Sequence, residues 1–180
     1  MLLVVDNGSV YTRNLVDFLT NIQICFATKT PDRLDLGSLV EYDSVILSGR
    51  RKNEQQTNKI NSKIIEHSIK YSKKLLGICY GAEILALTLG GTIRKTESPQ
   101  KGYELIAVQK ENMICDGEIR VFESHGYEIS KLPSSLICIG KSANCDYEII
   151  QYKSEPIFGT QFHPEMSHDG NNLIAKFCSI

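Results

Sequence analysis

The nine residues from Leu75 to Glu83 constrain the fold of this chain more than any other segment. Their short apolar start is typical of a buried strand, and the Gly-Ile-Cys-Tyr-Gly sequence at 77–81 indicates a sharp turn into a helix. In such a turn the central side chain projects at the end of a sheet from a strained backbone, and the flanking glycines allow close backbone approach. The helix N-terminus behind it favours a thiolate. A reactive Cys79 is the first hypothesis, and a small buried cysteine is the alternative.

A second pattern lies near the C-terminal end, where Gln-Phe-His-Pro-Glu occupies residues 161–165. In an extended segment, residues i and i+2 share a face, so His163 and Glu165 can point the same way, with Pro164 restricting the backbone between them. Alone, this pattern would indicate a surface turn. A cysteine nucleophile, however, needs a base, and the base needs an orienting carboxylate. Together the two patterns predict a catalytic triad of Cys79, His163 and Glu165.

Both patterns resemble signatures of the class I glutamine amidotransferases. Within that family the chain is most similar to the separate glutaminase subunit of a two-subunit guanosine monophosphate (GMP) synthetase. The similarity includes Val-Val-Asp-Asn-Gly at 4–8, Ser-His-Gly-Tyr at 124–127 and the segment from Gly159 to His168. The resemblance therefore covers almost the whole chain.

The resemblance implies a reaction and a partner. Cys79 would attack L-glutamine and form a glutamyl thioester, which yields glutamate and ammonia. The ammonia would pass to a separate ATP-dependent synthetase subunit that converts xanthosine monophosphate (XMP) to GMP. No cofactor is expected in this chain, since ATP and Mg²⁺ would be used by the partner. Low glutaminase activity alone, and higher activity with the partner, are expected.

Alternating apolar runs and amphipathic stretches predict the fold class. The expected strands are residues 2–5, 22–27, 43–47 and 75–78, and the expected helices are residues 10–20, 58–71, 81–89 and 169–180. This alternation predicts an α/β fold with an open, mostly parallel sheet flanked by helices, as in the flavodoxin-like fold of the family. From 92 to 159, short strands and turns predict a small antiparallel extension that covers one side of the sheet. We expect residues 1–180 to form a single domain.

Composition excludes several other classes of protein. The net charge of −1 gives no electrostatic reason to bind nucleic acid or an anionic membrane. The apolar runs are too short to span a bilayer, and the N-terminal residues lack the pattern of a signal peptide, so a cytoplasmic protein is expected. The six cysteines form no CxxC pair, and the four histidines lack zinc-site spacing, so no metal site is predicted.

The oxyanion hole implied by the resemblance departs from the family pattern. One donor would be the N–H of Tyr80, and the other would come from the loop after the third strand, usually Ser-Gly-Gly-Pro. This chain has Ser-Gly-Arg-Arg at 48–51, so Gly49 and Arg50 would supply that donor. Arginine disfavours the positive φ that glycine permits. Either the loop adopts another backbone conformation, or the hole forms only when a partner docks.

Substrate contacts follow from the same resemblance. Ser124, Gly126 and Tyr127 match the loop whose backbone holds the substrate's α-carboxylate. Glu83 replaces a usual glutamine and could pair with the α-ammonium of the substrate; the alternative is an exposed residue that favours the helix dipole. A carboxylate there would also raise the pKa of a nearby thiol.

Four further residues around the expected site have other predicted roles. His125 is not predicted as the base, because no carboxylate follows it by two residues. Asp6 is expected to cap the turn at residues 7–8. His168 and Asp169 are expected to lie near the partner, as the same vicinity does in the family.

Three other functions are compatible with these patterns. One is a glutaminase for another acceptor such as chorismate, as in anthranilate synthase component II. Another, suggested by Arg50 and Glu83, is a non-catalytic, amidotransferase-like regulatory or binding protein; an intact triad argues against it. A cysteine peptidase or other hydrolase with the same turn would not explain the match at 124–127.

Overall fold

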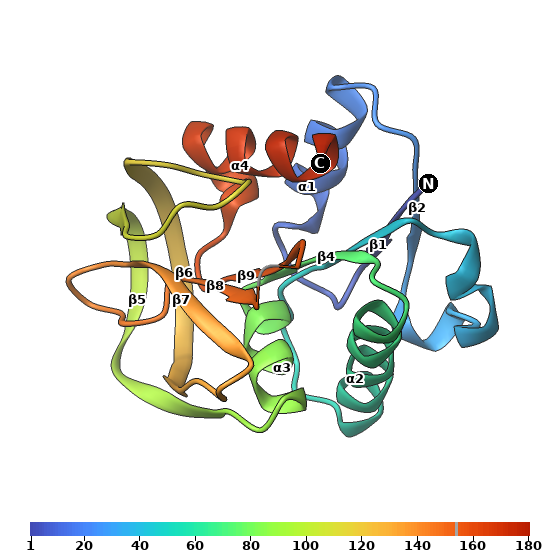
Figure 1. The fold of residues 1–180 in the computed structure, drawn as a ribbon, viewed down its shortest axis with the longest axis horizontal. Helices are drawn as coiled ribbons and strands as arrows, with labels where there is room; N and C mark the ends of the chain where they lie inside the picture. The colour runs from blue at the N-terminus through green and yellow to red at the C-terminus, as the bar shows by residue number, and fades with distance from the viewer. Residues whose placement is uncertain (154) are drawn as a thin grey trace.

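The computed structural model describes residues 1–153 and 155–180, which form one nine-stranded sheet with helices on both faces (Figure 1). The strands are β1 (Leu2–Val5), β2 (Phe26–Lys29), β3 (Ser44–Leu47), β4 (Lys74–Ile78), β5 (Thr92–Val108), β6 (Glu118–Lys131), β7 (Leu136–Lys141), β8 (Ile149–Tyr152) and β9 (Ile157–Thr160). The helices are α1 (Thr12–Asn21), α2 (Gln55–Lys70), α3 (Tyr80–Thr88) and α4 (His168–Ser179). Short 3₁₀ helices span Pro31–Arg33, Leu36–Glu41 and Pro164–Met166.

The strand order is β2-β1-β3-β4-β9-β8-β7-β5-β6, and the first five strands are parallel. This parallel half has the flavodoxin-like order, with β9 in the place of the fifth strand. Helices α1 and α4 cover one face of it, and α2 and α3 cover the other (Figure 1). The predicted α/β class and open sheet are confirmed. Because the carboxyl ends of the parallel strands meet at one edge, residues that follow them are brought together there.

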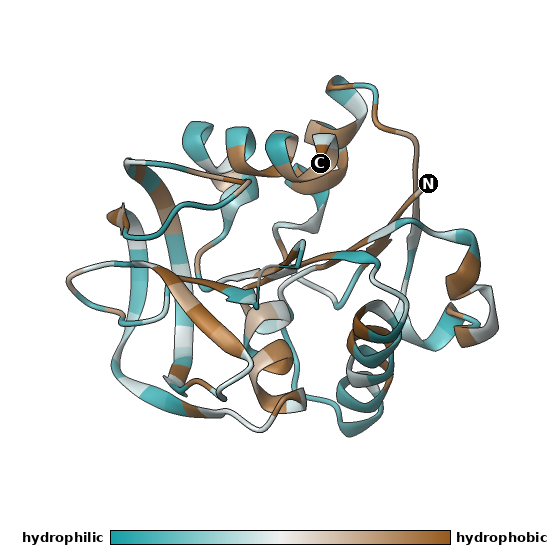
Figure 2. Ribbon diagram, in the orientation of Figure 1, coloured by the Kyte–Doolittle hydropathy of each residue, from teal (hydrophilic) through white to brown (hydrophobic). Residues whose placement is uncertain are grey.

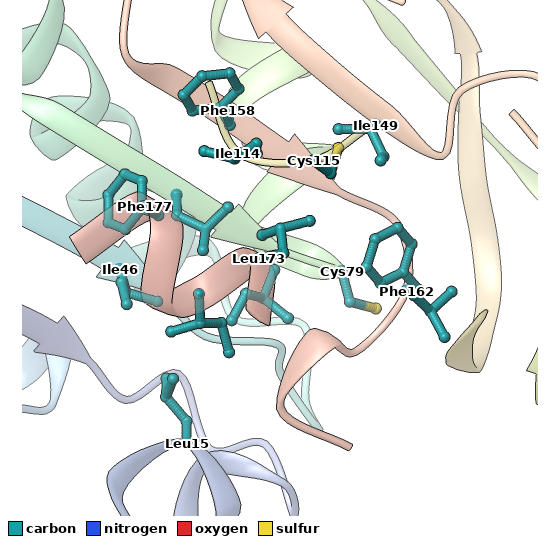
Figure 3. Packing of buried hydrophobic residues seen from close by; sticks show 14 of the residues in the cluster. Leu15, Ile46, Cys79, Ile114, Cys115, Ile149, Phe158, Phe162, Leu173 and Phe177 are labelled. Atoms are coloured by element: carbon teal, nitrogen blue, oxygen red, sulfur yellow. The ribbon is translucent and has the colours of Figure 1, made fainter. Parts of the chain in front are cut away.

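The central strands are apolar because both of their faces are buried, and successive side chains alternate between two cores. Leu2 and Val4 of β1 pack with α1 and α4, whereas Leu3 and Val5 pack with α2 and α3. In Figure 2 the central strands are largely apolar, and apolar segments alternate with polar ones along the flanking helices. Buried aromatic and aliphatic side chains such as Phe158 complete the first core, with Cys79 and Phe162 among its members (Figure 3).

Two expectations about the sheet differ from the structure. Strand β2 begins at Phe26 because Ile22 and Gln23 still close the end of α1, donating their N–H groups to Phe18 O and Thr20 O. The antiparallel strands are longer than expected, with 17 residues in β5 and 14 in β6. They continue the edge of the same sheet instead of covering one side, because β8 pairs antiparallel with β9 and the next strands add outward. Strand β9 itself belongs to the parallel half.

In the part of the chain that the structure describes, no helix is long and apolar enough to cross a membrane.

Candidate active site

Cys79 occupies the turn between β4 and α3, with φ 51° and ψ −102°. This is a region that L-residues rarely adopt. The turn is tight because a Cβ atom at Gly77 would lie 2.4 Å from Gly81 C, and one at Gly81 would lie 2.5 Å from Leu47 O. Both glycines are therefore needed for α3 to pack against the ends of β3 and β4. The sequence prediction of a strained turn with close backbone approach is confirmed.

His163 and Glu165 lie beyond the end of β9, the strand next to β4. The Cys79 N–H donates to Thr160 O at 2.7 Å, which holds the turn against the end of β9. His163 Nδ1 lies 2.9 Å from Glu165 Oε1, and both side chains are buried. The contact leaves Nε2 of the imidazole as the nitrogen available to another group. The expected pairing of this histidine with the carboxylate two residues on is present.

The loop after β3 lies against the imidazole. A Cβ atom at Gly49 would lie only 2.9 Å from His163 Cε1, so this position has no room for a side chain without a shift of the ring. On its other side the ring contacts Tyr11, with 4.6 Å between the ring centroids. The main-chain N–H of His163 donates to the carbonyl oxygen of Phe122 at 2.8 Å. Residues after β1, β3 and β9 thus contact the imidazole, and β6 holds the main chain of His163.

The pKa of the Cys79 thiol is raised well above its usual value, first by burial and then by the carboxylates of Glu83, Glu165 and Glu123. The helix N-terminus does not outweigh these effects, so the expected stabilisation of a thiolate is not the net result. The raising effect expected of Glu83 is present. A protonated thiol is a poor nucleophile, so any attack by this sulfur requires that a base remove its proton as the new bond forms.

Arg50 packs beside the turn and lies outside the positive-φ region. Its guanidinium lies 4.1 Å from the centroid of the Tyr80 ring, and its Nη1 donates to Asn53 Oδ1 and Asn58 Oδ1 at 2.8 and 2.9 Å. The Tyr80 hydroxyl donates to the same Asn58 oxygen at 2.8 Å. Burial raises the pKa of Tyr80 to about 12, so the hydroxyl keeps its proton. Arg50 therefore has a backbone conformation that arginine readily adopts.

Comparison with known proteins identifies the family. The family described as "Glutamine amidotransferase class-I" matches residues 3–179. The chain belongs to the class I glutamine amidotransferases. It is 32% identical over 184 residues to a subunit of the glutamine-hydrolyzing GMP synthase of Thermoplasma acidophilum, covering 98% of this chain and 90% of that protein.

Two further comparisons extend this result. A solved structure of a GMP synthase subunit from Thermoplasma acidophilum has a TM-score of 0.87 at 29% identity, covering 99% of this chain and 92% of that one. The GMP synthase of Hamiltonella defensa is a longer protein: 27% identity covers 98% of this chain but 36% of that protein.

In this amidotransferase Glu83 is buried in the first turn of α3, so the exposed alternative is wrong. Its Oε1 accepts a long hydrogen bond of 3.4 Å from Gln161 Nε2. Burial raises the pKa of Glu83, which indicates that its surroundings compensate the negative charge only in part. A cationic group entering the site would be attracted to this carboxylate.

The segment 124–127 lies on β6 at the side of the site. The Tyr11 hydroxyl donates to Ser124 Oγ at 3.1 Å. This segment is paired with β5 on either side of an irregularity, but a Cβ atom at Gly126 would meet nothing within 4 Å and Tyr127 is half exposed, so the side-chain side of these two residues faces open space. Asp6 Oδ1 accepts from the Gly8 N–H and the Thr12 hydroxyl, both at 2.9 Å, which confirms its predicted capping of the turn.

Sequence reasoning missed a second buried histidine–carboxylate pair in the amidotransferase. His125 Nε2 lies 3.1 Å from Glu123 Oε2, and both side chains are buried. The prediction for His125 depended on a carboxylate that follows the histidine, whereas the partner precedes it by two residues. The same i, i+2 rule for strands, applied in both directions, would have found it. The Arg50–Tyr80 contact was also missed, because no local spacing relates the two residues.

A cavity of about 780 Å³ opens on the Glu165 side of the site. Its lining includes Tyr103, Arg120, His168 and Asp169. Asp169 also accepts the Arg120 N–H at 2.8 Å, which ties the start of α4 to β6. Among the described residues, no group of three or more His, Cys, Asp or Glu side chains is arranged to hold a metal ion.

Proposed function

We propose that this chain hydrolyses L-glutamine to glutamate and ammonia with Cys79 as nucleophile, His163 as general base and acid, and Glu165 as the carboxylate that orients His163. The observation that carries the proposal is the strained Cys79 turn hydrogen-bonded to the end of β9, directly before the His163–Glu165 pair at 2.9 Å. These are the parts that nucleophilic acyl transfer needs.

The proton movements follow from this arrangement. Nε2 of His163 takes the thiol proton as Cys79 sulfur attacks the side-chain amide carbon of glutamine. The resulting imidazolium is stabilised by the adjacent Glu165 carboxylate, and it donates the proton to the departing nitrogen, so ammonia leaves and a glutamyl thioester remains. His163 then removes a proton from water, which attacks the thioester, and returns it to the sulfur as glutamate forms.

Backbone donors and two substrate contacts complete the proposal. Tyr80 is the first residue of α3, so its N–H has no partner within the helix and is available to an oxyanion. Gly49 and Arg50 are the proposed source of the second donor, since their loop lies against His163. We assign the substrate's α-ammonium to Glu83, and its α-carboxylate to the backbone at Ser124, Gly126 and Tyr127, the open stretch beside the site.

We further propose that the ammonia serves a separate ATP-dependent synthetase subunit that converts XMP to GMP. Support comes from the Thermoplasma acidophilum relative, which is named as one subunit of GMP synthase, and from the Hamiltonella defensa protein, in which a matching region makes up about a third of a longer chain. ATP and Mg²⁺ would bind the partner. The cavity at His168 and Asp169 is the proposed partner side of the site.

The test is glutamate release from glutamine by the purified chain, with and without an ATP-pyrophosphatase synthetase subunit, XMP, ATP and Mg²⁺. We expect slow release alone, faster release with the partner, and formation of GMP. Cys79→Ala should abolish glutamate release and keep the fold. Cys115→Ala is the matched control, because Cys115 is also a buried cysteine whose pKa is raised chiefly by burial, but it lies away from the β4–α3 turn.

Each outcome has a defined meaning. Residual glutamate release by Cys79→Ala would refute the nucleophile assignment. Release that the synthetase subunit does not change would keep the glutaminase and reject the GMP partner in favour of another acceptor. Absence of release under every condition would reject the proposed reaction in favour of a non-catalytic role.

A further inference from the structure

His125 joins two parts of β6 through its two ring nitrogens. Nδ1 lies 2.8 Å from the carbonyl oxygen of Tyr127, and Nε2 lies 3.1 Å from the Glu123 carboxylate. The imidazole and the carboxylate are both more than nine-tenths buried. The side chain therefore bridges Glu123 and Tyr127 on the buried face of β6, alongside the Ser124–Tyr127 segment.

Both partners of the ring are hydrogen-bond acceptors. The Tyr127 carbonyl is within hydrogen-bond geometry of Nδ1, whereas the Glu123 carboxylate lies at an ion-pair distance from Nε2 without hydrogen-bond geometry, so its attraction to the ring is strongest when the ring is an imidazolium. Burial opposes the charged form, but the Glu123 carboxylate and the Tyr127 carbonyl outweigh it, and the pKa of His125 is raised. The arrangement thus favours the charged form of His125 more than water does.

The acidic groups around the ring come from several elements. Glu123 lies on the same strand, and Glu83 on α3 also favours the charged ring. Glu148, directly before β8, is buried beside Glu123, and burial together with the Glu123 charge raises the pKa of Glu148 to about 9. Glu148 therefore holds a proton at neutral pH, and Glu123 is the carboxylate that lies against the His125 ring, at 3.1 Å. The thiol of Cys79 lies close enough to Glu123 for its pKa to be raised by it.

The same segment of β6 is also linked to His163, the proposed catalytic histidine. The carbonyl before Glu123, that of Phe122, accepts the His163 N–H at 2.8 Å. Ser124 Oγ accepts from the Tyr11 hydroxyl, and the Tyr11 ring contacts the His163 ring. These contacts fix the position of the Ser124–Tyr127 segment relative to His163, while the side-chain side of Gly126 faces open space.

We propose that His125 is a positioning residue, which the Glu123 carboxylate holds in its charged form and which shapes the Ser124–Tyr127 backbone to receive the α-carboxylate of the substrate. The proposal rests on the proposed function for the identity of that substrate. It assigns Glu123 and His125 a share in selecting amides that carry an α-carboxylate, without direct participation in bond breaking.

The experiment measures binding in the Cys79→Ala protein, so it does not depend on catalysis. Two amides are titrated by NMR: L-glutamine, and 4-aminobutanamide, which has the same side-chain amide and ammonium but no carboxylate. Adding Glu123→Gln should weaken glutamine binding about 10-fold or more. The affinity for 4-aminobutanamide should change by no more than about threefold, because this ligand has no carboxylate to bind the Ser124–Tyr127 backbone. Glu118→Gln, an exposed change at the start of the same strand, is the control.

A second readout is the pH titration of the His125 ring resonance, assigned with a His125→Gln variant. In the protein without the Glu123 change, we expect the midpoint to lie above the ordinary histidine value of about 6.5, and in Glu123→Gln we expect it to fall toward or below that value. A purely structural role for Glu123 would weaken both ligands alike.

The proposal is overturned if the His125 midpoint lies at or below the ordinary value, if both amides lose affinity equally, or if glutamine does not bind. Failure of the proposed function would give a different result. If the parent protein, with Cys79 intact, binds glutamine selectively but releases no glutamate, the proposed hydrolysis is rejected and the positioning role of His125 is kept.

Discussion

Replacing Cys79 by glycine should remove the proposed nucleophile and stabilise the fold relative to alanine at the same position. With φ 51° and ψ −102°, the backbone of Cys79 is in a region that costs an L-residue of order 1–3 kcal/mol. Alanine keeps the Cβ atom and therefore the strain. Glycine relieves it, but its more flexible unfolded chain costs about 0.5–1 kcal/mol.

The difference between these terms gives the expected magnitude. Cys79→Gly should be about 1 kcal/mol more stable than Cys79→Ala, which corresponds to a rise in Tm of about 2–4 °C for a chain of this size. Neither variant should release glutamate. Urea titration gives the free energy of unfolding, and thermal unfolding by circular dichroism gives the Tm.

The same pair of substitutions at Cys115 provides the control. Cys115 is buried but has no positive φ, so there glycine should be less stable than alanine by about 0.5–1 kcal/mol. If Cys79→Gly were less stable than Cys79→Ala by the margin found at Cys115, the turn would not be strained, and the reasoning about its backbone would be refuted.

Three other changes have defined outcomes. Gly49→Ala places a methyl group 2.9 Å from His163 Cε1, so the ring must move by about 0.5 Å, and the kcat for glutamine should fall about 10–100-fold. Gly37→Ala, where the added methyl group has ordinary contacts, is the control and should leave kcat unchanged. Equal kcat values for the two variants would contradict the contact between Gly49 and the ring. Arg50→Ala removes the contact with the Tyr80 ring and two hydrogen bonds, and should lower the free energy of unfolding by about 1–2 kcal/mol in urea titrations, in contrast to the exposed Arg51→Ala. Burial raises the pKa of Glu148 in the folded protein to about 9, above its value in the unfolded chain, so between these two pKa values the folded state holds a proton that the unfolded state releases. The free energy of unfolding therefore falls as pH rises through this range, by up to about 1.4 kcal/mol per pH unit. Glu148→Gln should remove this dependence, becoming more stable than the parent at pH 8 and similar to it near pH 4; parallel Tm profiles would show that Glu148 is not protonated in the fold.

Features that depend on local spacing could be predicted from the sequence. The strand–turn–helix at Cys79 follows from two glycines around it, and the contact between His163 and Glu165 follows from their separation by two residues. The cap at Asp6 is likewise a matter of neighbouring residues. The parallel half of the sheet follows from the alternation of apolar runs with amphipathic helices.

Features that depend on contacts distant in sequence could not be predicted. The contact between Arg50 and the Tyr80 ring depends on α2, whose Asn58 Oδ1 accepts hydrogen bonds from both side chains. The burial of Glu83 and Glu148 depends on how α3 and β8 meet β6, and polar residues in such positions contradict the usual hydrophobic pattern. The antiparallel half was expected to cover the sheet, since nothing in the spacing of its strands indicates that β8 pairs with β9.

The position of β9 also sets the order in which this protein can assemble during synthesis. The strand lies between β4 and β8 in the middle of the sheet, yet it is the last strand in the chain. Until it emerges from the ribosome, β4 and β8 each present an unpaired edge to other nascent chains. Cys79 is translated long before His163, and the turn that holds it has no Thr160 carbonyl to bind until β9 inserts. The strand that completes the sheet is therefore also the one that brings in His163, so on the proposed mechanism a half-made chain carries the Cys79 thiol without the base that would activate it.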